Sequence, residues 1–427
     1  MRVFKVKPIV LVPFASPIHG KEYCAAVLDS FKKHFEGHDI AVAPLVDSVE
    51  KADRVGKEYR DYFPIALILT GGTSKLVRRF VESGVHERLI LLAHGEHNSL
   101  PSATSVRAKL ESAGIYVWLY YCDEHYSPEC RDVVSNAMRV AYAVTKILGS
   151  RIGVVGVEEK SEAMSDFEAR FGAEIELITF DELEEVISKV GSSEDVQKFV
   201  EDAKHRLELR LSEEKLPEIG KIYLALRNLF TSRKLDGLAI ECFDYIARYG
   251  IAPCLALAKL NEEGFVTACE ADIASLFLMM LSFVLTGRSG WMANLSRVRG
   301  DRVYLAHCTV PLSITGKAFL VDHFETGKPY AVSGELNMSV ATMVSISSDF
   351  SLMVAELVRV EKSGFLGHGF CRTGAVLDLE FSAEEIPLVA PANHHVLIPG
   401  DVRRELRVIA ELLGIDFVTY RELVEIV

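Results

Sequence analysis

Short, continuously apolar segments alternate with helical patterns over residues 8–147, and this alternation limits the possible fold more than any other feature. The apolar segments are PIVLVPF, IALILT, RLILLA and YVWLYY, and a helical pattern over residues 22–36 follows the first of them. Strands that are apolar on both faces are typical of parallel sheets covered by helices. We therefore expect an N-terminal α/β domain, residues 1–147, with a Rossmann-like parallel sheet.

A second α/β pattern starts at RIGVVGV and continues through AEIELITF and a charged helical stretch over residues 193–232. The segments LAIECF, APCLALAKL and FVTACE follow, and we interpret each of them as a short buried strand. Together these segments predict a second Rossmann-like parallel-sheet domain, residues 148–299.

The pattern changes beyond residue 300, where the segments RVYLAHCTV, PYAVSGEL, SVATMVSIS, SLMVAELVRVE and AVLDLEF are separated by glycine and polar turns. Such segments indicate a mostly antiparallel domain, which ends in a helix over residues 402–413, a stop at Gly414 and the strand DFVTY. The expected fold is therefore α/β, with two Rossmann-like parallel-sheet domains followed by a β-rich, mostly antiparallel C-terminal domain, residues 300–427.

Charge and hydropathy narrow the classes of partner. The 427 residues carry a formal net charge of −13, whereas nucleic-acid binding draws mainly on clustered Lys and Arg. The most apolar stretch, residues 273–285, is shorter than the roughly 20 residues that span a bilayer. We expect a small-molecule partner, no nucleic acid and no membrane.

The N-terminus and the cysteines indicate the cellular compartment in which we expect the protein. Val3, Phe4 and Val6, followed by PIVLVPF, predict a buried first strand rather than a signal peptide, because no small-residue cleavage site follows them. The eight cysteines include no CxxC pair, so neither a zinc ribbon nor a dense disulfide framework is expected. These features favour a reducing cytoplasm, with the thiols packed as small hydrophobic groups.

Two carboxylates stand between an apolar segment and a helical pattern. Apolar residues at helical spacing predict a helix over residues 273–285 that Gly287 ends, and FVTACE precedes this helix. Glu270 and Asp272 therefore lie between a buried strand and a helix N-terminus. Carboxylates there either cap the helix and complement its dipole, which suits Asp272, or serve a binding site, which suits Glu270.

Histidines supply the rest of a candidate site. His307 lies in the strand-like segment VYLAHCTV, where a histidine is either a hydrogen-bonded core residue or a ligand. Asn393, His394 and His395 follow an Ala-Pro pair in a loop. Imidazole combined with carboxylate oxygens suits Mn²⁺ or a related divalent cation, whereas a structural zinc site prefers thiolates. The residues alone predict a carboxylate and imidazole site of unspecified task.

At these residues the chain resembles the C-terminal part of the L-fucose isomerase and L-arabinose isomerase superfamily, over roughly residues 220–427. The shared pattern comprises Glu270-x-Asp272, a long helix, Thr286-Gly287, position 294, and Asn393-His394 before a last helix and strand. The resemblance implies that Glu270, Asn294 and His394 bind a divalent metal, most often Mn²⁺, and that His307 corresponds to an additional ligand. It also implies a homo-oligomer, a trimer or a hexamer.

The activity implied by the resemblance is aldose–ketose isomerisation, in which a proton moves between C1 and C2 of an open-chain sugar through an ene-diol. The metal polarises the sugar oxygens, and carboxylates of tuned pKa exchange the proton. One position departs from the pattern, because Asn294 stands where the fucose isomerases have an acid/base Asp. Either Asp272 supplies the second carboxylate or the site performs a different reaction, so Glu270, Asp272 and Asn294 are the candidate catalytic residues.

Further residues are candidate substrate contacts. His94, His97 and Asn98 follow RLILLA, at the edge where parallel sheets bind ligands, although they also suit capping of the next helix. In the superfamily that the chain resembles, such an N-terminal domain serves the site of a neighbouring subunit. Arg372 either binds an anionic substrate group through its planar fork or forms a salt bridge. His307 and Asn393 complete this set.

The resulting hypothesis is a metal-dependent sugar isomerase that acts on an open-chain sugar or a related polyhydroxy compound. Three alternatives stay open. The first is an epimerase or a lyase that uses the same site. The second is a non-catalytic sugar-binding or regulatory protein. The third is an assembly subunit with a degenerate site.

Overall fold

The computed structural model describes residues 8–191 and 193–426, which divide into two compact units. Unit 1 comprises the residues up to Leu148 together with Glu405–Ile415, and unit 2 comprises Gly149–Arg404 together with the residues from Asp416 onward. The domain boundaries expected near residues 147 and 299 remain predictions. Val3, Phe4 and Val6, which we assigned to the first strand, lie outside the described residues.

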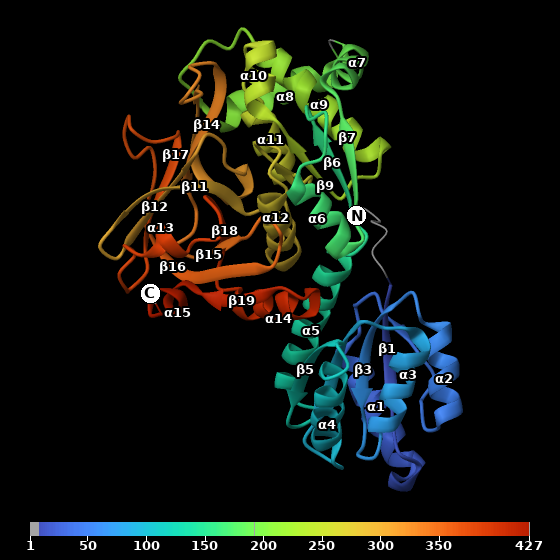
Figure 1. Cartoon of the computed structure of the whole chain (residues 1–427). Coiled ribbons are helices and arrows are strands. Elements are labelled where there is room, and N and C mark those ends of the chain that lie inside the picture. The colour runs from blue at the N-terminus through green and yellow to red at the C-terminus, as the bar shows by residue number, and fades with distance from the viewer. Residues whose placement is uncertain (1–7, 192, 427) are drawn as a thin grey trace. The chain divides into compact units, whose positions relative to one another are not determined.

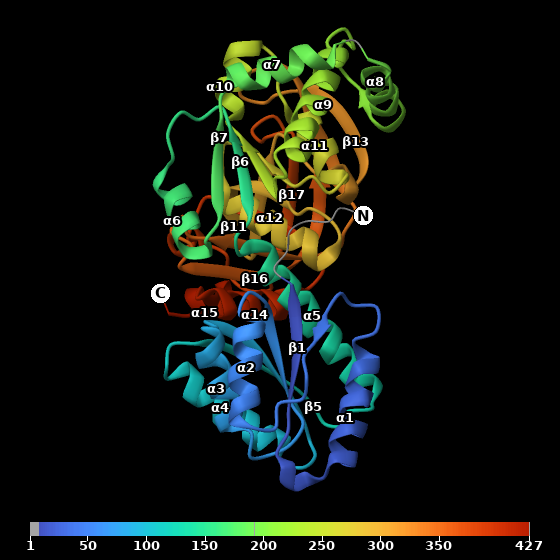
Figure 2. The ribbon, with the colours of Figure 1, turned by 90° about the vertical axis from the view of Figure 1, so that its right-hand side faces the viewer.

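Unit 1 is built on a five-stranded parallel sheet in the order β2-β1-β3-β4-β5. The strands are β1 (Ile9–Phe14), β2 (Ala41–Val42), β3 (Phe63–Ile68), β4 (Arg88–His94) and β5 (Tyr116–Cys122). Figure 2 shows helices on both faces: α2 (Val49–Glu58), α3 (Ser74–Gly84) and α4 (Ser99–Glu111) on one, α1 (Lys21–His34) and α5 (Pro128–Ile147) on the other. Because β1 and β3 are buried at every position, their continuous apolar sequence is explained.

Unit 2 begins with a four-stranded parallel sheet in the order β10-β9-β6-β7. Its strands are β6 (Arg151–Val155), β7 (Glu174–Ile178), β9 (Gly237–Ile240) and β10 (Thr267–Ala268). The helices of this region are α6 (Glu162–Phe171), α7 (Phe180–Val190), α8 (Glu194–Arg206), α9 (Leu216–Ser232), α10 (Cys242–Tyr249), α11 (Cys254–Glu262) and α12 (Ile273–Thr286). The second expected parallel sheet is therefore present.

Six further strands of unit 2 close into an antiparallel barrel (Figure 1). Their order is β15 (Val340–Ile346), β18 (His394–Pro399), β11 (Trp291–Arg299), β12 (Arg302–His307), β17 (Thr373–Asp378) and β16 (Leu352–Gly364), and β16 pairs back onto β15. Strand β19 (Asp416–Thr419) adds to β16 in parallel. The α/β fold with two parallel sheets and an antiparallel C-terminal part is thus confirmed.

Smaller elements complete the chain. A three-stranded sheet joins β13 (Thr315–Asp322) to β14 (Pro329–Leu336) and to β8 (Glu208–Leu209). The remaining helices are α13 (Ile386–Val389), α14 (Arg403–Leu413) and α15 (Tyr420–Val424), with 3-10 turns at Pro17–His19 and Leu312–Ile314. Most of α14 packs with unit 1, where Glu405 accepts hydrogen bonds from Asn136 and Arg139.

Three secondary-structure predictions are wrong. The helical stretch expected over residues 193–232 is two helices separated by β8, and His394 and His395, which we expected in a loop, lie in strand β18. The third is a predicted strand that is a helix. APCLALAKL, which we interpreted as a buried strand, contains the first two turns of helix α11. Nearly all of this helix is buried, so no polar face reveals the helical period. The abundance of Ala and Leu, both strong helix formers, was the available signal.

Two further findings concern the cysteines and the surface. A disulfide joins Cys122 at the end of β5 to Cys130 in the first turn of α5, a pairing that the cysteine spacing had not indicated.

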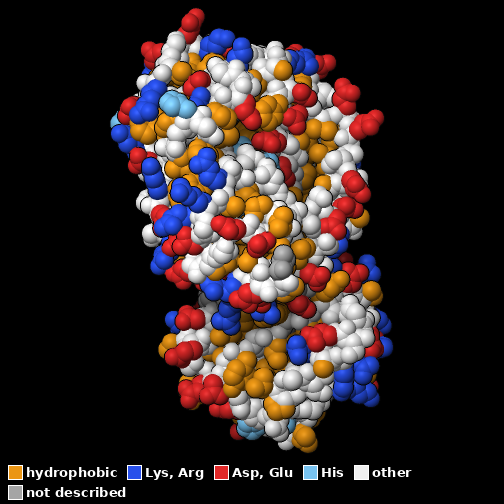
Figure 3. All heavy atoms as spheres, turned by 60° about the vertical axis from the view of Figure 1, so that its left-hand side comes forward, with side chains coloured by type: hydrophobic (Ala, Val, Ile, Leu, Met, Phe, Trp, Pro, Cys, Tyr) orange, Lys and Arg blue, Asp and Glu red, His pale blue; other side chains and the backbone are white. Residues whose placement is uncertain are grey.

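Among the described residues no helix combines the length and hydropathy needed to cross a bilayer. On the face drawn in Figure 3, acidic and basic side chains are interspersed.

Candidate metal centre

Glu270 lies in the tight turn that joins β10 to α12. Glu270 and Ala271 both have left-handed backbone conformations, with φ of 58° and 49°. Non-glycine residues in this conformation cost on the order of 1–3 kcal/mol and are concentrated at functional sites. The turn is fixed by hydrogen bonds from Ala271 N to Ile240 O and from Asp272 N to Cys269 O. The chain therefore maintains a strained backbone where the Glu270 carboxylate is presented.

Barrel strand β11 brings two histidines to this carboxylate. Asn294 of β11 pairs with Ala306 of β12 on one side and with His394 of β18 on the other. His307, the last residue of β12, and His394, the first residue of β18, are thus neighbours across one strand. Their ring centroids lie 5.9 Å apart. This register explains how residues far apart in the sequence meet.

The three side chains form a compact set of donor atoms. His307 Nε2 lies 3.3 Å from Glu270 Oε1, and His394 Nε2 lies 3.5 Å from Glu270 Oε2. One donor atom from each residue fits within 4.8 Å of the other two. His394 Nε2 is buried without a hydrogen-bond partner, an uncommon state for a polar atom that a bound cation would relieve. One carboxylate with two imidazoles suits a divalent transition metal.

Asp272 binds the far side of His394. Asp272 Oδ2 lies 2.7 Å from His394 Nδ1 and accepts a hydrogen bond from Ser275 Oγ, while Asp272 Oδ1 accepts one from Ser275 N. Asp272 is therefore both the N-cap of α12 and the partner of a candidate metal ligand. An imidazole that donates from Nδ1 leaves the Nε2 lone pair free for a metal.

The charges of the site stabilise one another. Burial disfavours the ionised form of Glu270, but the hydrogen bond and charge of His307, together with the charge of His394, outweigh burial and lower the pKa of the carboxyl. Burial is likewise outweighed at Asp272, where the bond to His394 lowers the pKa. Both carboxylates are therefore ionised at neutral pH.

Two small cavities flank the site. One of about 110 Å³ contains Glu270, Asn294 and His307, and its other walls include His323, Glu325 and several cysteines. The second, of about 260 Å³, lies beside Asp272, Asn393 and His394 and is lined with serines and small apolar groups. Neither set of described lining residues includes Lys or Arg.

Asn294 and Asn393 connect the two cavities. Asn393 Nδ2 donates to Asn294 Oδ1 over 2.6 Å. The Asn294 carbonyl oxygen, which we expected to face a metal, is thus engaged by a neighbouring amide. His395, next to His394, is fully buried and forms a hydrogen bond with the hydroxyl of Tyr420. His395 therefore binds within the core, whereas the adjacent His394 lies beside Glu270.

Arg372 forms a salt bridge within this structure. Its Nη2 lies 3.0 Å from Asp322 Oδ2, its Nε donates to Asp322 O over 2.7 Å, and its guanidinium lies over the ring of Phe324. Any role in binding an anionic substrate group would require this pair to open.

The candidate residues of β4 and its loop belong to unit 1. His94 is fully buried and bonds Leu69 O and Glu96 N, so it fixes the loop. His97 and Asn98 have left-handed backbones with φ of 47° and 57°. His97 stacks on Tyr23 with ring centroids 3.6 Å apart. These residues form a local group with its own hydrogen bonds, including one from Tyr23 to Glu96.

Sequence reasoning missed His323 and Glu325, and also Cys308 and Cys371, as members of the smaller cavity. A hydrogen bond from Cys371, helped by His323, lowers the pKa of Cys308, and the same bond raises the pKa of Cys371. No spacing pattern indicated this group, since its members come from separate strands and loops. The adjacency of Cys308 to His307 was the one available hint.

Sequence comparison finds similarity to known proteins of one class, sugar isomerases. No protein-family model matches the chain. The sulfoquinovose isomerase of Priestia aryabhattai is 23% identical over 314 residues, which cover 67% of each chain. The sulfoquinovose isomerase of Alkalicoccus urumqiensis is 25% identical over 218 residues, 45% of this chain and 46% of the relative, and that of Clostridium sp. (strain MSTE9) is 24% identical over 216 residues. This similarity supports a relationship to sugar isomerases.

Proposed function

We propose that the chain is a metal-dependent aldose–ketose isomerase of the fucose and arabinose isomerase type. The observation that carries the proposal is the convergence of Glu270, His307 and His394 on one point, within 4.8 Å of one another. The similarity to proteins named sulfoquinovose isomerase supports the same reaction class.

In this proposal Glu270, His307 and His394 hold the cation, with Mn²⁺ the preferred ion because carboxylate and imidazole donors without thiolate suit it. Asp272 orients His394 and is not itself a base, since both of its oxygens are occupied by Ser275 and His394. When bound, the cation polarises the carbonyl and the adjacent hydroxyl of the sugar.

Proton transfer then falls to the Glu270 carboxylate. It removes the C2 proton of the open-chain aldose, which leaves an ene-diol, and returns a proton to C1, while a hydroxyl proton moves from O2 to O1. Substrate and product are isomers, so no external oxidant is needed. A lowered pKa keeps Glu270 ionised and ready to accept the proton.

The substrate is an open-chain sugar or a related polyhydroxy compound. Sulfonated hexoses belong in the first panel tested because of the names of the relatives. Arg372 is the candidate anchor for an anionic group, and its bond to Asp322 would have to open. His307 and Asn393 remain candidate contacts, and a homo-oligomer would allow His94, His97 and Asn98 to serve a neighbouring site.

Asn294 favours a second candidate function, a non-catalytic sugar-binding protein. Its amide cannot act as a general base, and its oxygen is engaged by Asn393. Sugar binding without turnover under any divalent cation would support this alternative.

The experiment is a turnover assay on the full chain, stripped of metal and reloaded with Mn²⁺. Neutral and sulfonated aldoses are incubated in D₂O, and ketose formation with deuterium at C1 is followed by NMR. Glu270→Gln is expected to reduce turnover by about 10²–10⁴-fold. Glu335→Gln, the same change at an exposed position of β14, is expected to leave it unchanged. Full activity of Glu270→Gln would overturn the proposal.

A further inference from the structure

Thiols form nearly half of the wall of the smaller cavity. All of them are free in the structure: Cys242, Cys254, Cys269, Cys308 and Cys371. The same wall contains Glu270 and His307, so the thiols share a cavity of about 110 Å³ with the candidate metal centre. The proposed isomerisation uses none of them, which leaves their placement to be explained.

Two of these thiols are brought together by paired strands. His307, at the end of β12, is the partner of Thr373, at the start of β17, in an antiparallel ladder. Cys308 directly follows His307, and Cys371 lies two residues before Thr373. Both cysteines therefore lie at the same end of the ladder. Cys371 packs against the apolar cluster that contains Cys308.

Access to the two sulfurs differs. Cys308 is 4% exposed, whereas Cys371 is only partly buried. The other three lining cysteines, Cys242, Cys254 and Cys269, are 2–3% exposed. A reagent from solution therefore meets Cys371 first, and Cys308 lies behind it within the protein. This is the arrangement of an accessible thiol beside a resolving thiol.

We propose that Cys371 and Cys308 form a thiol–disulfide exchange pair that reacts with a low-molecular-weight disulfide such as glutathione disulfide. The Cys371 sulfur attacks one sulfur of the small disulfide, and its proton passes to the departing small thiolate, so that a mixed disulfide forms and one small thiol is released. The Cys308 thiolate then attacks the Cys371 sulfur, which forms the Cys308–Cys371 bond and releases the second small thiol. The two protein thiols are oxidised, and the small disulfide is reduced to two thiols.

The bond would affect the neighbouring metal centre. Cys308 directly follows His307, so linking Cys308 to Cys371 restricts the backbone that positions the imidazole. We expect the oxidised protein to retain less Mn²⁺ than the reduced protein. This consequence rests on the proposed function, whereas the exchange reaction does not.

The test treats the full chain with excess glutathione disulfide, blocks free thiols and identifies linked peptides by mass spectrometry. The wild-type protein is expected to yield a Cys308–Cys371 peptide pair that a dithiol reductant removes. Cys308→Ser is expected to retain one glutathione on Cys371, because the resolving thiol is gone. Cys371→Ser is expected to leave Cys308 unmodified. Cys242→Ser, a change elsewhere in the same wall, should form the wild-type link.

Two results would overturn the proposal, and both come from the wild-type protein, so the folding of the variants does not decide them. One is that Cys308 and Cys371 stay free at equilibrium with glutathione disulfide. The other is that Cys371 retains glutathione or that either thiol links to a different cysteine. Mn²⁺ binding is measured separately on both forms, so a protein that exchanges thiols but binds no metal would refute only the proposed function.

Discussion

Asp272 Oδ2 lies 2.7 Å from His394 Nδ1, and this contact determines which ring nitrogen of His394 faces Glu270. The same carboxylate caps helix α12 through Ser275 N. A helix start in the parallel-sheet part of unit 2 is thereby connected to a barrel strand, and the connection passes through a candidate metal ligand.

Replacing Asp272 by Asn is expected to weaken Mn²⁺ binding by about 10–100-fold, because the amide no longer provides a charged acceptor for His394 Nδ1. Isothermal titration of the stripped protein measures the affinity. Ser275→Ala is the matched control, since it removes a neighbour of Asp272 and keeps the contact with His394. Equal affinities of wild type and Asp272→Asn would refute the positioning role.

Replacing Asn294 by Asp is expected to strengthen Mn²⁺ binding by at least about tenfold, because a carboxylate is added to the cavity that contains Glu270 and His307. The same titration measures the gain. Asn337→Asp, the same change at an exposed position, is expected to have no effect. Weaker binding by Asn294→Asp would mean that position 294 does not face the cation.

His94 gives unit 1 a dependence on pH. Burial lowers the pKa of His94 to about 4, and its two bonds, to Leu69 O and from Glu96 N, suit the neutral ring. The unfolded chain has a histidine pKa near 6.5, so it binds a proton first as the pH falls. Stability is complete above about pH 6.5 and falls, by on the order of 3 kcal/mol, as the pH approaches 4.

Urea unfolding of wild type and His94→Gln at several pH values checks this expectation. The free energy of unfolding of the wild type should fall more steeply between pH 6.5 and 4 than that of the variant, which carries no titrating ring. Parallel curves would exclude His94 as the cause.

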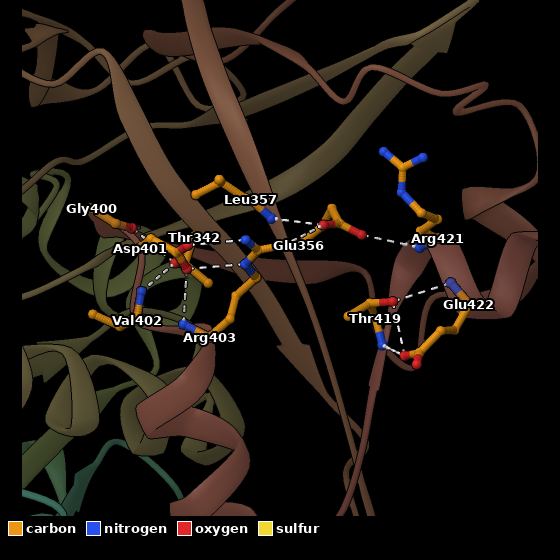
Figure 4. Close-up of polar contacts among 10 residues, drawn as sticks. All are labelled: Thr342, Glu356, Leu357, Gly400, Asp401, Val402, Arg403, Thr419, Arg421 and Glu422. Atoms are coloured by element: carbon orange, nitrogen blue, oxygen red, sulfur yellow. Dashed lines mark hydrogen bonds and ion pairs between the residues drawn. The ribbon is translucent and has the colours of Figure 1, made fainter. Parts of the chain in front are cut away.

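Glu356 of β16 binds Arg403 of α14 and the backbone of Arg421 in α15 through the contacts drawn in Figure 4. Glu356 is 4% exposed, and its carboxylate accepts hydrogen bonds from Leu357 N, Arg403 Nη1 and Arg421 N. Glu356→Gln is expected to lower the free energy of unfolding by about 1–3 kcal/mol, as for other bonds to buried charged groups.

The matched control is Glu361→Gln on the same strand. Glu361 forms an ion pair of two hydrogen bonds with Arg302 at the surface. Loss of this ion pair is expected to lower the free energy of unfolding by less than about 1 kcal/mol. Thermal or urea unfolding compares the two variants. A larger loss at Glu361 than at Glu356 would contradict the assignment of Glu356 as a buried anchor.

The parallel sheets were predictable because their strands are buried on both faces and are therefore continuously apolar, as in β1 and β3. Strand β11 was not predicted, since its first three residues are buried and its remaining six are either partly buried or exposed, so it follows neither strand pattern. Helix α11 was misassigned because nearly complete burial removes the helical period.

The site was predictable in its residues and not in its contacts. The turn at Glu270 and the Asn393-His394 pair stood out in the sequence, and the structure places Glu270 beside His394. The roles of Asp272 and Asn294 depend on partners 122 and 99 residues away, which only the register of β11 with β18 brings close. Cys308 and Cys371 meet through the ladder between β12 and β17, which has no local signature.

The central claim is that Glu270, His307 and His394 bind one divalent cation. Its most direct test is the Mn²⁺ content and affinity of the stripped and reloaded protein, by elemental mass spectrometry and titration. The variants are Glu270→Gln, His307→Ala and His394→Ala, with His368→Ala, an exposed histidine of the same unit, as the control. The account predicts stoichiometric Mn²⁺ in wild type and control and at least about a 100-fold loss of affinity in the other three. Equal Mn²⁺ content in all five proteins, or negligible Mn²⁺ in the wild type, would contradict it.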